Sequence, residues 1–314
     1  MPLSISFRRN RTGRRSPAGE IAMLTSQQVG EFHANGFVIA RGVFHGRELE
    51  DLRRAARRLQ DKAKQHLYPG TRYWYQGSQS GEGVPPESRA AATWGVNEIT
   101  RPELFDPALV NVFGHATIDH DLHALLGPEP RAWGIKMLWT PKVMPYNLGW
   151  HRDQMAKDLY DYVYLKPAAN DHVQFNAALN EDRCFLVVPG SHRRALTPVE
   201  WQAVLVQRTK ELPGQVEAAL HPGDVLYMDA HALHRGRSNI EEDRLTLHYS
   251  AQAQWVPLQS WGEPEHFAWL LAPAFLDQLT PATRPYYERL GTASQTTEML
   301  CFLKDAARVH GFKG

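Results

Sequence analysis

The chain has 314 residues, with 35 basic and 34 acidic side chains and a formal net charge of +1, so it has no global basic field to bind nucleic acid. Its hydrophobic content of 43% excludes a disordered or fibrous chain, and its length is sufficient for one large core. No apolar run reaches the roughly 20 residues of a membrane helix. We therefore expect a small-molecule partner, with neither nucleic acid nor a membrane involved.

Two features at the level of the whole chain predict its compartment and its domain limits. Residues 1–22 are arginine-rich and without periodicity, which predicts a flexible tail before a single domain over residues 23–314. Cys184 and Cys301 are the only cysteines, which is too few for a disulfide framework and is typical of a reducing compartment. We predict a cytoplasmic protein in which both are buried thiols.

The first elements are predicted from capping and periodicity. Thr25 to Gln28 have the arrangement of a capping box, so a helix is expected to run to His33 and to end at Gly36. Residues 37–40 are expected to form a strand. Apolar residues at helical spacing over 47–66 predict an amphipathic helix that covers one face of a sheet.

Residues 67–95 lose this periodicity and are rich in Pro, Gly and Ser. Such a long irregular segment inside a domain is typical of a lid or a mobile loop, and residues 154–172 have the same character. An aromatic cluster, Tyr73, Trp74 and Tyr75, stands at the start of the first segment. These rings either pack on the core or line a substrate mouth, and the sequence leaves both open.

The middle of the chain predicts an antiparallel β core. Short apolar runs separated by turn residues occur at 132–140, 172–179, 184–188, 224–228 and 244–250. This pattern favours a sandwich or barrel, and a jelly roll over about residues 131–255 is the natural candidate. Apolar spacing becomes helical again over 258–314, near Phe267, Tyr286 and Met299. These helices pack on the sheet within one chain or form the contact of a homodimer.

One set of residues predicts a metal site. His151 and Asp153 are two apart, so on a strand they face the same side, and His234 and Arg244 follow 81 and 91 residues after Asp153. Two histidines and a carboxylate can fill one face of an octahedron and leave the opposite face open, as non-haem Fe(II) oxygenases require. With 15 histidines in the chain, the first pair alone is weak evidence.

The order of motifs around these residues strengthens the prediction. The pair at His151 is followed by the turn Pro189–His192, the strand that begins at Gly223–Asp224, and His234 with its following Gly and Asn. This order resembles the phytanoyl-CoA dioxygenase family of Fe(II)- and 2-oxoglutarate-dependent oxygenases, from about Leu24 to Trp255. The spacing of Gly and Asn selects His234 over His231.

The resemblance implies a double-stranded β-helix, a jelly-roll or cupin-like fold, with flanking N-terminal and C-terminal helices. It implies that His151, Asp153 and His234 are the iron ligands and that Arg244 binds the C5 carboxylate of 2-oxoglutarate, with O2 as the second co-substrate. The chain departs from the family at residues 181–184, where an Asn-Gly pair is common.

Three further residues are candidates around the site. Gln174 and Asn176 share a face of an apolar strand, where buried polar groups must find partners. Because the resemblance places this strand beside the co-substrate, we predict that both contact 2-oxoglutarate. Lys136 lies in the strand 132–140, and we predict that it points outward, because an inward lysine would require a charged partner.

These residues predict a 2-oxoglutarate-dependent dioxygenase that hydroxylates or otherwise oxidises a small organic substrate and releases succinate and CO2. A role in secondary metabolism is an analogy at the level of the fold. Asp153 favours hydroxylation over halogenation, because halogenating relatives carry a small residue in its place. The alternatives are a non-catalytic, cupin-like ligand-binding protein that holds a metal, and a zinc hydrolase with the same ligands. The sequence does not identify the substrate.

Overall fold

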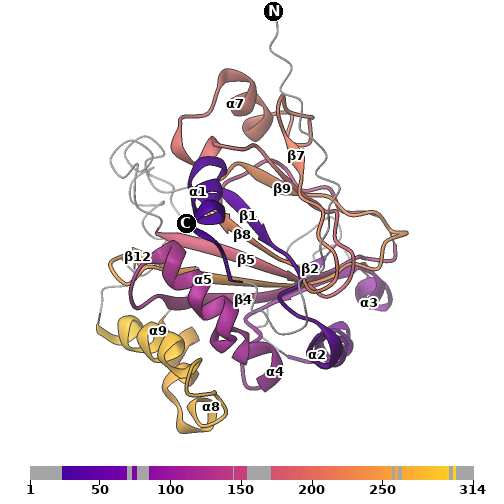
Figure 1. Ribbon diagram of the computed structural model, residues 1–314. Coiled ribbons are helices and arrows are strands. Elements are labelled where there is room, and N and C mark those ends of the chain that lie inside the picture. Colours follow the sequence, from indigo (N-terminus) through magenta and orange to yellow (C-terminus); the bar gives the residue numbers. More distant parts are fainter. Residues whose placement is uncertain are drawn as a thin grey trace, which may run out of the picture.

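A computed structural model describes residues 23–68, 73–75, 85–143, 145–153, 171–256, 259–260, 264–296 and 300–301 (Figure 1). Within these ranges two antiparallel sheets form the centre of the molecule. The large sheet has seven strands in the order β1-β8-β5-β10-β4-β3-β2, and the small sheet has the order β7-β6-β9. A short parallel pair, β11 with β12, stands apart from both sheets.

The large sheet consists of β1 (Phe37–Ala40), β2 (Tyr73–Tyr75), β3 (Thr93–Asn97), β4 (Arg131–Trp139), β5 (His172–Ala178), β8 (Val225–Asp229) and β10 (Leu245–Gln252). The remaining strands are β6 (Phe185–Val187), β7 (Val216–Glu217), β9 (His234–Gly236), β11 (Gln259–Ser260) and β12 (Leu300–Cys301). The strands predicted from the apolar runs and at residues 37–40 are confirmed, with ends that differ by at most two residues. This architecture confirms the predicted fold class, a mainly β double-stranded β-helix with flanking helices.

The helices are α1 (Ser26–Asn35), α2 (Gly46–Lys64), α3 (Arg89–Ala92), α4 (Pro107–Val110), α5 (Ala116–Leu126), α7 (Pro198–Leu205), α8 (Pro273–Leu276) and α9 (Arg284–Thr296). Short 3-10 turns are η1 (Pro86–Ser88), η2 (Asn111–Gly114), η3 (Ser191–Arg193) and η4 (Pro264–Leu271). In Figure 1, α2, α4, α8 and α9 lie on one side of the large sheet, and the small sheet and α7 lie on the other. No helix in the described ranges is both long and apolar enough to cross a membrane.

Strand alternation divides the interior into an apolar layer and a polar layer. Along β10, Leu245, Leu247 and Tyr249 belong to the large core shared with the helices. The alternate residues Thr246 and His248 are equally buried but face the small sheet. The space between the two sheets therefore carries the polar side chains, and the candidate site lies there.

Local signals placed the N-terminal elements correctly. Thr25 and Gln28 form the predicted capping box of α1, and Gly36 ends that helix at φ 81, a left-handed conformation that glycine adopts without strain. The amphipathic helix predicted over 47–66 is α2. The described parts of residues 67–95 contain β2, η1, α3 and the start of β3, so these parts are not irregular as predicted.

The helix predicted around Met299 and the loop predicted over 154–172 have different outcomes. The helix predicted around Met299 is wrong at residues 300–301, which form β12 and pair with β11. Most of the predicted 154–172 loop, and Cys301's side chain, lie outside the described residues.

Cys184 is the predicted buried thiol. The arginine-rich tail, the single-domain division, the homodimer and the cytoplasmic location stay predictions.

Candidate metal centre

Two histidines face each other because the backbone joins their strands. His151 and His234 form an antiparallel bridge in which each backbone N–H donates to the other residue's carbonyl, with both N···O distances 3.0 Å. Their ring centroids lie 4.4 Å apart. His234 opens β9, whereas His151 stands in an isolated bridge and Asp153 in a bend, so the strand predicted for this pair is wrong. The bridge nevertheless brings the three side chains together.

The side chains of His151, Asp153 and His234 converge on one point. One ligand atom from each lies within 4.8 Å of the others. The Asp153 carboxylate is 3.6 Å from His151 Nε2 and 3.8 Å from His234 Nε2. The Nδ1 atoms lie 2.7 Å from the Gly149 carbonyl and 2.9 Å from the Ala232 carbonyl, respectively. Each Nδ1–H therefore donates to backbone, and each Nε2 lone pair is left for a metal.

The pKa values of Asp153 and His234 favour the binding of a cation in this cluster. Burial alone would raise the pKa of Asp153, but His234, His151 and Lys136 hold that pKa well below its ordinary value. Burial, followed by the charge of His151, lowers the pKa of His234 to about 4. An ionised carboxylate and a neutral imidazole are the protonation states that ligate a divalent metal.

Arg244 is buried beside this cluster and is held on three sides. Its Nε donates to Asp182 Oδ2 at 2.7 Å, its Nη1 to the Tyr146 hydroxyl, and its Nη2 to His248 Nε2 at 3.1 Å. The Thr246 hydroxyl donates to the same Asp182 oxygen at 2.5 Å. A guanidinium has five N–H donors, so two remain for a further acceptor.

The pKa values in this group follow from one buried ion pair. Burial would raise the pKa of Asp182, but Arg244 and the hydrogen bond from Thr246 lower it below its ordinary value. The same carboxylate raises the pKa of Arg244 despite the opposing effect of burial. Burial and then the charges of Arg244 and Lys136 hold the pKa of His248 well below its usual range, so its ring is neutral.

Asn176 and Gln174 both face the space between the sheets, as predicted. Each is buried, and β5 pairs them with His248 and Ser250 of β10. Among the described residues, Asn176 Oδ1 and His248 Nδ1 have no hydrogen-bond partner. Polar atoms that are buried in this way require a ligand or water to satisfy them.

The prediction for Lys136 is wrong. It pairs directly with His248 of β10 and with Asn97 of β3, and residues directly opposite in a sheet share a face. Its side chain therefore points inward, where its charge contributes to the low pKa of Asp153. The side chain is only half-buried, so the full cost of burying an unpaired ammonium does not arise.

Several residues that build the site could not be selected from sequence. Asp182, Tyr146, Thr246 and His248 position Arg244, yet Asp182 and Tyr146 are 62 and 98 residues away along the chain. The one signal was the departure at residues 181–184, where an acid stands in place of the usual turn. His248 is also buried, and its ring contacts Arg244 Nη2.

The fold and the cluster together define a class of protein. A double-stranded β-helix with two histidines and one carboxylate at its mouth is the framework of the non-haem iron enzymes that use 2-oxoglutarate. The family profile of phytanoyl-CoA dioxygenase (PhyH) matches residues 32–244. The chain belongs to this family, and the predicted recognition is confirmed.

Solved structures of low sequence identity have the same fold. Iron-bound EctD from S. alaskensis is 21% identical with a TM-score of 0.56, and the match covers 75% of this chain and 79% of that one. HygX from Streptomyces hygroscopicus, solved with nickel and 2-oxoglutarate, is 18% identical with a TM-score of 0.52, covering 77% and 92%. SnoK, a carbocyclase of nogalamycin biosynthesis, is 18% identical with a TM-score of 0.51, covering 74% and 85%. No curated protein sequence matches this chain.

Proposed function

We propose that this protein is an Fe(II)- and 2-oxoglutarate-dependent dioxygenase that hydroxylates a small organic substrate and releases succinate and CO2. The observation that carries this proposal is the convergence of His151, Asp153 and His234 within 4.8 Å. Their donor set, two imidazoles and one carboxylate, fits Fe(II) and leaves one side of the metal open. Bound Fe(II) would supply the activation of O2, which side chains cannot perform.

The protein's own residues orient the metal ligands. The carbonyls of Gly149 and Ala232 accept from Nδ1–H of His151 and His234, which fixes the ring orientation and the tautomer of each ligand. Asp153 completes the face from the bend that follows His151. Because the backbone bridge joins the two histidines, their imidazoles would be positioned before the metal binds.

Arg244 is proposed to bind the C5 carboxylate of 2-oxoglutarate. Its two remaining N–H donors match a carboxylate, and the adjacent Nδ1–H of His248 has no acceptor in the described part of the chain. Asn176 and Gln174 extend this polar wall along β5 and are proposed to complete the contacts with the co-substrate. Asp182 offsets the charge of Arg244 and fixes the orientation of its guanidinium.

The type of oxidation is a finer proposal than the class. Asp153 occupies the carboxylate position, which favours hydroxylation over halogenation. The fold also accommodates other outcomes, since SnoN is named an epimerase and SnoK a carbocyclase, both of nogalamycin biosynthesis. A small-molecule substrate in secondary metabolism is consistent with these neighbours.

The test is an anaerobic titration of the metal-free protein with Fe(II) and 2-oxoglutarate, followed by the weak visible charge-transfer band of the chelate. We expect the band in the wild type, none in Asp153→Ala, and a strongly weakened 2-oxoglutarate affinity in Arg244→Ala. Arg237→Ala is the matched control, because the Arg237 side chain is 43% exposed and forms its ion pairs with Glu211 and Glu217, outside the candidate site. Wild-type protein that binds iron but gives no band would overturn the proposal and favour the metal-binding module.

A further inference from the structure

Lys136 is a cation in the candidate site that the proposed chemistry does not use. Its strand, β4, places it in one row with Asn97 of β3 and His248 of β10. His248 in that row contacts Arg244 Nη2 at 3.1 Å, so Lys136 lies next to the proposed co-substrate clamp. Two cationic side chains on one face are unfavourable unless an anion offsets each of them.

Among the described residues, no acidic side chain lies within ion-pair distance of Lys136. Arg244 has the Asp182 carboxylate at 2.7 Å, whereas Lys136 has no ion pair among the described residues. Its nearest specific contact is the ring of Trp74, whose centroid lies 5.9 Å from Lys136 Nζ. Such a contact is worth about 0.5–1 kcal/mol at exposed sites and does not neutralise the charge.

The direction of Lys136 separates it from the proposed co-substrate site. Trp74 belongs to β2, two strands from β4 on the side opposite β10. An ammonium close to that ring is therefore turned away from the strand that follows Arg244. The proposed C5 carboxylate already has Arg244 and His248, so a second anion is the better match for Lys136.

An apolar wall stands next to this ammonium. Trp74 packs over Gly95 and against Leu138, and a Cβ atom at Gly95 would come within 2.6 Å of the Trp74 ring and 2.5 Å of Leu138 Cδ2. Trp74 stacks on Trp94, with ring centroids 5.7 Å apart, and Trp94 stacks on Tyr146 at 4.6 Å. Because the Tyr146 hydroxyl accepts from Arg244, the wall continues to the proposed co-substrate clamp.

We propose that the primary substrate is an organic acid, whose carboxylate, sulfate or phosphate group binds Lys136 while its apolar part packs against Trp74. This assignment rests on the proposed function of the metal centre. Asn97, directly opposite Lys136, offers a side-chain amide to the same anionic group. The substrate would then lie between the metal cluster and the β2 edge of the large sheet.

The test compares an acid with its neutral isostere on the anaerobic Fe(II)–2-oxoglutarate protein. Indole-3-acetate and indole-3-acetamide are titrated by calorimetry into wild type, Lys136→Gln and Lys136→Arg. We expect the acid to bind about tenfold or more tightly than the amide in wild type, as one charge-assisted hydrogen bond predicts. Lys136→Gln removes the charge and should reduce this ratio to below about threefold. Lys136→Arg keeps the charge and changes its geometry, so it should retain most of the ratio.

Two further variants sharpen the result. Lys62→Gln removes a charge from an exposed position on α2 and should leave the preference unchanged. Trp74→Leu should weaken the acid and the amide by about the same factor, because it removes an aromatic surface that both probes would contact. Equal binding of the two probes by wild type, or no binding of the acid, would overturn the proposal. So would a Lys136→Gln variant that loses 2-oxoglutarate affinity and keeps the preference for the acid.

The visible band recorded before each titration distinguishes the two proposals. A band with no preference for the acid overturns the substrate assignment alone. Absence of the band in wild type overturns the metal centre and the substrate assignment with it.

Discussion

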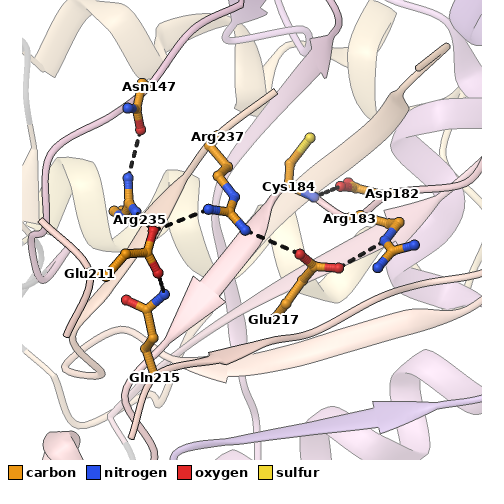
Figure 2. A network of polar contacts seen from close by, with 9 residues as sticks. All are labelled: Asn147, Asp182, Arg183, Cys184, Glu211, Gln215, Glu217, Arg235 and Arg237. Atoms are coloured by element: carbon orange, nitrogen blue, oxygen red, sulfur yellow. Dashed lines mark hydrogen bonds and ion pairs between the residues drawn. The ribbon is translucent and has the colours of Figure 1, made fainter. Parts of the chain in front are cut away.

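Arginine and carboxylate side chains meet on both sides of the small sheet, and the two groups differ in exposure. Inside, the Arg244 and Asp182 side chains are 4% and 2% exposed. Outside, Arg235 and Arg237 contact Glu211, and Arg237 and Arg183 contact Glu217 (Figure 2). The Glu211 and Arg183 side chains are 63% and 62% exposed, whereas that of Arg235 is 1% exposed.

The comparison shows that the same chemical pairing has two different roles. The outer pairs of Arg183 and Arg237 are in contact with water and counterions, so each is worth little, about 0–1 kcal/mol. The inner pair lies where an uncompensated charge would be costly, so either partner alone would destabilise the fold. Asp182 therefore allows a fully buried guanidinium to exist beside the metal cluster, with two N–H donors left for a second carboxylate.

The largest effect is expected for Asp182→Asn. The Asp182 carboxylate accepts from Arg244 and Thr246 through Oδ2 and from the Cys184 amide through Oδ1. An asparagine replaces one acceptor with an NH2 group and leaves Arg244 without a counter-charge. We expect a loss of about 3–5 kcal/mol in the free energy of unfolding, measured with urea, together with weaker 2-oxoglutarate binding. A loss below about 1 kcal/mol would contradict a structural role for this ion pair.

A pH titration tests the same pair without removing an atom. The folded-state pKa of Asp182 lies below its ordinary value of 3.8, because Arg244 and Thr246 stabilise the carboxylate. Its contribution to stability is therefore complete above about pH 4 and is lost as the pH falls through the lowered folded pKa. Urea unfolding of wild type and Asp182→Asn between pH 6 and pH 3 should show a difference that shrinks at the acid end. A constant difference would mean that the ion pair is not its cause.

The sequence predicted the elements whose signals are local. The capping residues Thr25 and Gln28 and the left-handed Gly36 define α1 within a few residues of one another. The β core was recognised because its buried strands are apolar runs with turn residues between them. The helix predicted around Met299 is wrong at β12, because apolar spacing within one segment does not reveal pairing with a distant strand, here β11.

The candidate site could be predicted only in part, for the same physical reason. His151, Asp153 and His234 belong to a motif whose order along the chain is itself a signal. The Asp182 and Tyr146 partners of Arg244 carry no such order, since each is an ordinary residue type placed by the crossing of distant strands. The outward direction predicted for Lys136 is wrong because its ammonium is only half-buried beside Trp74. Its desolvation costs less free energy than that of a fully buried ammonium.

The smallest effect is expected on the outer side, for Glu217→Gln. Glu217 accepts from Arg183 Nε at 2.8 Å and from Arg237 Nη2 at 3.4 Å, and both arginine side chains are well exposed. The change should reduce the free energy of unfolding by no more than about 1 kcal/mol and leave 2-oxoglutarate binding unchanged. Because salt screens exposed charges, the reduction should disappear in about 1 M NaCl, whereas most of the loss in Asp182→Asn should persist. Urea unfolding at low and high salt checks both variants. A loss of unfolding free energy in Glu217→Gln that persists in high salt would mean that the outer ion pairs stabilise the fold about as much as the buried pair does.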